Sequence, residues 1–174
     1  GASPYSGSAR VTVYDADRLV TINDPASGVF LYRTAGDILF RGEATVSADR
    51  LGANFIVPKD ISYGAENGRI TAYTWSGSAD GAGYTRNIRI AGTDTTAPPD
   101  AEGPSISIYL DSKDFRPGDA VSAAPTLLLD LADSSGVNTS RAGIGHRLEA
   151  WFDGQPASVD LTDYYRSAPD TYTK

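Results

Sequence analysis

The stretch Arg69-Ile-Thr-Ala-Tyr-Thr-Trp75 decides the fold class, because its side chains alternate in character at a period of two residues. Arg86-Asn-Ile-Arg-Ile-Ala91 shows the same alternation further along the chain. This period is typical of a β-strand with one buried and one open face. In Arg69–Trp75 the alternation places Tyr73 and Trp75 on the same face of the predicted strand.

Similar stretches surround these two and are separated by Gly, Pro, Asn and Asp. They cover Ala9–Tyr14, Arg18–Ile22, Gly28–Tyr32, Ile38–Val46 and Ala53–Val57. Short strands at such close spacing are typical of a β-sandwich. We therefore predict an all-β fold with an immunoglobulin-like β-sandwich over residues 1–95.

A second, smaller β-unit is predicted over residues 105–174, after a polar, proline-rich linker at 96–104. Its expected strands are Ser105–Leu110, Pro125–Leu131 and Arg147–Phe152, and 161–165 is expected to form a short helical turn. These strands are too few for a complete sandwich. Either the second unit is truncated at its C-terminal end, or its strands complete the first sheet.

The composition narrows the possible partners and chemistry. The 174 residues carry a net charge of −7, with 40% hydrophobic residues and no cysteine. An acidic chain without a basic cluster is expected to bind neither nucleic acid nor an anionic membrane surface. The lack of cysteine excludes disulfides, thiolate metal sites and a cysteine nucleophile within these residues. No apolar run reaches the length of a membrane span, and the start at Gly1 without methionine suggests an excised segment.

Three blocks of sequence resemble the region that follows the catalytic domain in gingipain-like cysteine peptidases. The closest subgroup is the surface signal peptidase (sortase) of the type IX secretion system. The blocks are Leu39–Val46, Phe55–Tyr63 with Gly68–Tyr73, and Glu102–Leu110 followed by Asp133–Asn138, Gly143–His146 and Asp163–Tyr165. As an ordered set they cover roughly residues 9–174.

The resemblance implies a non-catalytic β-sandwich fragment of a larger secreted or surface peptidase of the Bacteroidetes type. The fragment would support or orient the catalytic domain of the same polypeptide, and it would dock substrate or secretion-system proteins. The family's catalytic Cys and His lie upstream, so no catalytic residue is carried over. We therefore expect no enzymatic activity from this chain and an extracellular or outer-membrane location.

Two other features could bear chemistry, although each also has a structural interpretation. His146, the single histidine, is expected to bond loop backbone rather than to act in catalysis, because no Gly-x-Ser-x-Gly motif supplies a nucleophile. Asp130 and Asp133 are the better candidates for a Ca²⁺ site among the close carboxylate pairs. Asx-turns explain these pairs adequately, so we predict no cofactor.

The aromatic residues Tyr73 and Trp75, joined by Tyr84, are the candidates for surface recognition. Exposed rings at this spacing could stack on sugars or on a protein partner. The alternative interpretation is that they pack at the edge of the core. If the rings are exposed, the favoured second function is that of a carbohydrate-binding or adhesive domain.

Overall fold

The computed structural model describes residues 4–62, 66–97, 99–141 and 147–174. Over these residues the fold is all-β and sandwich-like, as predicted, with antiparallel sheets and one 3-10 turn, η1 (Thr162–Tyr164). The strands are β1 (Gly7–Tyr14), β2 (Arg18–Asp24), β3 (Gly28–Thr34), β4 (Ile38–Ser47), β5 (Arg50–Leu51), β6 (Gly68–Trp75), β7 (Asp80–Ile88), β8 (Ser105–Leu110), β9 (Leu127–Ala132), β10 (Glu149–Ala150) and β11 (Val159–Asp160).

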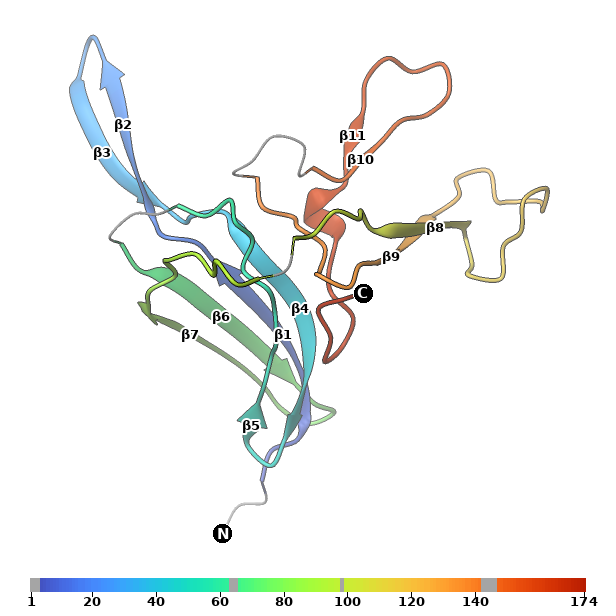
Figure 1. The fold of residues 1–174 in the computed structure, drawn as a ribbon, viewed down its shortest axis with the longest axis horizontal. Helices are drawn as coiled ribbons and strands as arrows, with labels where there is room; N and C mark the ends of the chain where they lie inside the picture. Colours follow the sequence, from blue (N-terminus) through green and yellow to red (C-terminus); the bar gives the residue numbers. More distant parts are fainter. Residues whose placement is uncertain (1–3, 63–65, 98, 142–146) are drawn as a thin grey trace.

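A curled five-stranded sheet in the order β5-β4-β1-β6-β7 forms the body of the molecule (Figure 1). β1 lies at its centre and pairs along its length with β4 on one edge and β6 on the other. Val11 of β1 lies opposite Gly42 of β4 and Ala72 of β6. This register fixes which side chains of the three strands share a face.

The core lies on one face of this sheet. Val11, Val13 and Phe40 are buried there, and the ring of Phe40 stacks on Phe55 with centroids 5.1 Å apart. The partly buried residues that complete the cluster come from distant segments. They are Phe55, Ile70, Ile90 and Tyr172.

Three hairpins extend away from this sheet (Figure 1): β2–β3, β8–β9 and β10–β11. Each forms a separate two-stranded sheet. The β8–β9 hairpin carries a long connection that begins at Asp111, whose carboxylate accepts hydrogen bonds from the backbone N–H of Ser122 at 2.9 Å and of Thr126 at 2.8 Å. These bonds lower the pKa of Asp111 and hold the connection closed at its base.

The C-terminal segment occupies an edge of β4 that β5 leaves free. Ser167 donates its backbone N–H to Arg41 and accepts from Glu43, in a parallel bridge at Gly42. Asp170 donates its N–H to the Glu43 carbonyl at 3.0 Å. The C-terminal segment thus meets β4 through an isolated bridge, whereas the strands β8 to β11 stay in separate sheets.

The buried carboxylate of Asp15 organises the chain just after β1. It is 1% exposed. It accepts the backbone N–H of Ala16 at 2.7 Å and that of Ser62, 47 residues further along the chain, at 2.5 Å. A buried carboxylate needs such partners to offset its lost hydration, and here they attach the irregular segment before residue 63 to the sheet.

Three strand predictions are changed by the structure, and in one of them the strand expected at Arg147–Phe152 is reduced to the two residues of β10, Glu149–Ala150. Ala53–Val57 was expected to be a strand and this is wrong, and it is the C-terminal segment that bonds to β4, at Arg41 and Glu43. Its Phe55 contributes packing without pairing. The strand expected at 86–91 corresponds to β7, which begins earlier, at Asp80, and ends at Ile88. The helical turn expected at 161–165 is confirmed as η1.

Gly42 is required by close packing, and this generates a stability prediction. A Cβ at this position would lie 2.3 Å from the Phe40 ring, whereas a Cβ at Gly83 would meet nothing within 4 Å. The stacked ring of Phe55 limits how far Phe40 can move. We expect Gly42→Ala to lower the free energy of unfolding by about 1–3 kcal/mol, measured by denaturant titration. Gly83→Ala is the control, and equal effects of the two changes would contradict the packing argument.

Asp170 generates a prediction on acid stability. The Thr45 hydroxyl and then the Thr45 backbone N–H, at 2.6 and 2.8 Å, lower the pKa of Asp170 below its ordinary value of 3.8. A lowered native pKa stabilises the fold above pH 3.8, and that stabilisation disappears as the pH falls through the native value. We expect Asp170→Asn to lower the melting temperature at neutral pH and to leave it nearly unchanged near pH 2.

The control is Asp153→Asn, which alters an exposed carboxylate with no ion pair or hydrogen bond in the described part of the chain. Asn keeps the left-handed backbone that Asp170 adopts at φ 58°. A drop in melting temperature of the same size at both pH values would show that the charge of Asp170 plays no part.

Candidate functional site

The candidate site is the face of the five-stranded sheet opposite the core. Because β1 buries Val11 and Val13, its intervening residues Arg10 and Thr12 point to the other side. In register with them on β6 lie Tyr73 opposite Arg10 and Thr71 opposite Thr12. β7 then places Tyr84 opposite Thr71. The alternation predicted from the sequence thus becomes one continuous polar and aromatic surface, the open face.

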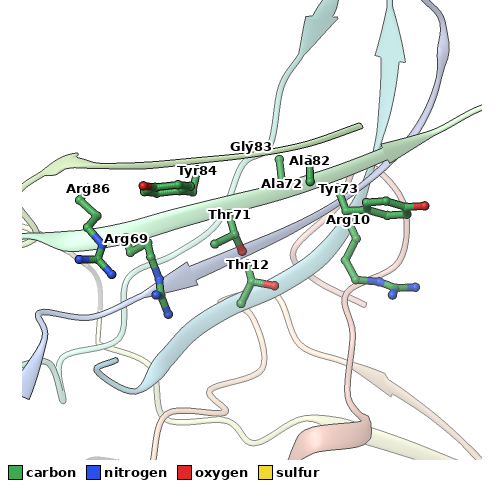
Figure 2. Close-up of a pocket in the computed structure, with 10 residues that line it drawn as sticks. All are labelled: Arg10, Thr12, Arg69, Thr71, Ala72, Tyr73, Ala82, Gly83, Tyr84 and Arg86. Atoms are coloured by element: carbon green, nitrogen blue, oxygen red, sulfur yellow. The ribbon is translucent and has the colours of Figure 1, made fainter. Parts of the chain in front are cut away.

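A hollow of about 520 Å³ lies on the open face (Figure 2). It is lined from three strands, β1, β6 and β7. The lining residues are Arg10, Thr12, Arg69, Thr71, Ala72, Tyr73, Ala82, Gly83, Tyr84 and Arg86. Two of the three aromatic residues that the sequence singled out, Tyr73 and Tyr84, therefore belong to one concave surface.

The aromatic rings of this face are accessible. Tyr84 is 74% exposed and Tyr73 is 44% exposed. Trp75 is half-buried and stacks on Tyr73, with centroids 5.8 Å apart and an interplanar angle of 22°. The rings lie on the side of β6 away from the Phe40 cluster. None of the three rings belongs to that core cluster.

A hydrogen bond orients the exposed ring of Tyr73. Its hydroxyl donates to the Asp80 carboxylate at 2.9 Å. This bond, together with the negative charge of Asp80, raises the pKa of Tyr73. The phenol therefore stays protonated at neutral pH. The bond is exposed to water and serves mainly to fix the direction of the ring.

Arginines surround these rings, and sequence reasoning did not identify them. The Arg10 guanidinium lies 5.8 Å from the Trp75 ring centroid and pairs with Glu43 at 3.5 Å. The Arg69 guanidinium lies 4.4 Å from the centroid of the Tyr14 ring. Arg69 lies on the same strand face as Tyr73, and the alternation along the sequence could have shown this. Arg10 and Arg86 lie on other strands, and their place beside Tyr73 is known only once the pairing of β1, β6 and β7 is known.

Two arginines of the hollow lack a carboxylate partner. Within the described ranges, neither Arg69 nor Arg86 forms an ion pair. The Nε atoms of Arg10 and Arg69 are buried and have no hydrogen-bond partner there.

The carboxylates proposed for calcium have protein partners. Both oxygens of Asp130 lie 2.7 Å from the Lys113 ammonium. Asp133 accepts the backbone N–H of Ser135 at 2.8 Å and its hydroxyl at 2.7 Å, which is an Asx-turn. No group of three or more potential metal ligands occurs among the described residues. Calcium binding at these two residues remains a prediction to be tested.

His146 and the glycines at 143 and 145 lie outside the described residues, so their expected structural role is neither supported nor opposed. Among the residues that the structure does describe, no helix is long and apolar enough to cross a membrane.

A second, smaller hollow of about 200 Å³ lies where the C-terminal unit meets β4. Here the Arg41 guanidinium donates to the backbone carbonyl of Asp163 at 2.5 Å. Arg141 pairs with the Asp163 carboxylate at 2.8 Å and with Asp160 at 3.5 Å. These charges are matched within the protein, so this hollow is a junction between the two units.

Comparison of the chain with protein-family models, with curated proteins and with solved structures found no match. The resemblance to the gingipain-like peptidases therefore rests on the sequence blocks alone.

Proposed function

We propose that this chain is a non-catalytic docking module of a larger surface protein. The observation that carries this proposal is its exposed area of 11968 Å². A compact monomer of 18.3 kDa would expose about 8,100 Å². The excess of about 3,800 Å² on this one chain is larger than the roughly 1,000–2,500 Å² that one partner contributes to an obligate interface. A chain of this shape is therefore suited to contact with other protein surfaces.

The β2–β3 hairpin supplies much of the excess apolar area. Its exposed large side chains are Leu19 (59%), Ile22 (47%), Val29 (64%), Phe30 (50%), Leu31 (63%) and Tyr32 (45%). They lie on both faces of the hairpin, because Ile22 pairs opposite Phe30 while Leu31 pairs opposite Thr21. An isolated two-stranded hairpin is marginally stable in water, and contiguous apolar surface of this kind marks an interaction site.

The occupant that we propose for this hairpin is the catalytic domain of the same polypeptide. The sequence blocks support a gingipain-like peptidase of the type IX secretion system as the parent protein, located at the outer-membrane surface or secreted. In that setting the module orients the peptidase domain and docks substrate or secretion-system proteins. Proteolysis by this chain alone would overturn the non-catalytic assignment.

The test compares two substitutions, Leu31→Asp and Thr21→Asp, at residues that lie opposite each other in the hairpin. A charge at position 31 would be buried against the partner domain, whereas in this chain alone residue 31 is exposed. We expect Leu31→Asp to lower the melting temperature of the longer native polypeptide by several degrees and that of the 174-residue chain by little. Thr21→Asp should have the smaller effect in the longer protein.

Because Thr21 lies opposite Leu31 on the same face, equally small effects of the two substitutions in the longer polypeptide would show that this hairpin face is not an interface. A concentration-dependent dimer of the 174-residue chain, broken by Leu31→Asp, would instead assign the hairpin to a second copy and overturn the proposed occupant.

The open face favours carbohydrate recognition as a second function. The observation is specific: Tyr73, stacked on Trp75, and Tyr84 present accessible rings beside a hollow with hydroxyl-bearing Thr12 and Thr71. Flat aromatic rings pack against the apolar faces of sugar rings, while hydroxyl and guanidinium groups bond to the sugar oxygens. Such a site would make the module adhesive at a cell surface.

Tyr84→Ala tests this second function. Tyr84 is 74% exposed, so its removal should leave the fold intact, and a glycan screen should then show loss of binding. Tyr164→Ala removes a ring that is 80% exposed but lies outside the hollow, and binding should persist. If both variants bound the same glycans as the unmodified chain, the open face would not be the glycan site.

A further inference from the structure

The hollow on the open face carries a charge opposite to that of the whole chain. The protein has a net charge of −7, yet Arg10, Arg69 and Arg86 line the hollow and no Asp or Glu does. Glu43 neutralises Arg10, and the other two arginines keep an unpaired positive charge among the described residues. An acidic chain that concentrates free guanidinium groups in one concave surface attracts an anion there.

The side chains divide the hollow into parts (Figure 2). Arg69 and Arg86 extend from neighbouring strands at one end, in the same direction, with Tyr84 beside them. Thr12 and Thr71 lie across from each other between the two ends. Tyr73 and Arg10 lie at the other end. A guanidinium pair, hydroxyl groups and an aromatic ring thus follow one another along a single surface.

We propose that this hollow binds an acidic oligosaccharide, with a sugar carboxylate held by Arg69 and Arg86. The proposal rests on the carbohydrate function proposed above for the same face and names its ligand class. The planar guanidinium offers paired N–H donors that match a carboxylate. The neighbouring sugar rings pack on Tyr84 and Tyr73, and their hydroxyls bond to Thr12 and Thr71.

The observations favour this ligand over the other anions. A single-stranded nucleic acid also uses arginine and aromatic rings, but its many phosphates would be repelled by a chain of net charge −7. An acidic peptide would use the guanidinium pair without needing the Tyr73–Trp75 stack. A short glycan with few carboxylates uses every part of the hollow at a small electrostatic cost.

Trigalacturonic acid and its methyl ester make the decisive pair of probes, because the ester has the same rings without the charge. Binding would be followed by calorimetry and by tryptophan fluorescence, since Trp75 stacks on Tyr73. We expect the acid to bind about tenfold more tightly than its ester, and Arg86→Gln or Arg69→Gln to weaken binding of the acid by a similar factor. Arg50→Gln, on exposed β5 away from the hollow, should leave the affinity unchanged.

The outcomes separate this inference from the function on which it rests. Equal binding of acid and ester that Tyr84→Ala abolishes would overturn the acidic preference and retain the glycan site. Failure of the acid, the ester and the glycan screen alike would overturn both. Tighter binding of an oligonucleotide or an oligoglutamate than of trigalacturonic acid would assign the arginines to another ligand. A thermal melt of each variant checks that the loss of binding is not loss of the fold.

Discussion

The double pairing of β1 is the constraint on which the rest of the structure depends. With β4 on one edge and β6 on the other, every second residue of β1 must point to the same side. Val11 and Val13 on one side gather the core, and Arg10 and Thr12 on the other begin the open face. A shift of one residue in this register would exchange the two faces and expose the core. Stability and the candidate site therefore follow from the same hydrogen-bond ladder.

The second constraint is the free edge of β4. Unpaired strand edges are open to further pairing, and here Ser167 and Asp170 satisfy this one from the far end of the chain. The captured segment brings Tyr172 to the core and places Asp163 beside Arg41. The C-terminal unit is thereby attached through backbone bonds, while its hairpins stay free to project (Figure 1).

The sequence predicted the parts of the fold that local alternation determines. Arg69–Trp75 and Ser105–Leu110 are strands almost residue for residue. Ala53–Val57 is at least as apolar and is not a strand, because strand formation depends on pairing, and the segment that pairs with β4 at Gly42 is the distant one at Ser167. A pairing between residues more than 120 positions apart leaves no local signal. For the same reason the sequence singled out Tyr73 and Tyr84 but missed the arginines that pairing brings beside them.

The two proposed surfaces place different demands on the same small core. The β2–β3 hairpin exposes apolar area that is unfavourable in water and gains free energy by being covered. The open face instead presents charged and polar groups, which lie in water at little cost, so it is stable uncovered and can remain free until a ligand arrives. The hairpin is therefore suited to a permanent contact within a larger protein, and the open face to reversible recognition. Under the two proposals, the separate β2–β3 sheet would hold the chain in a larger protein while the five-stranded sheet stays free to bind a ligand.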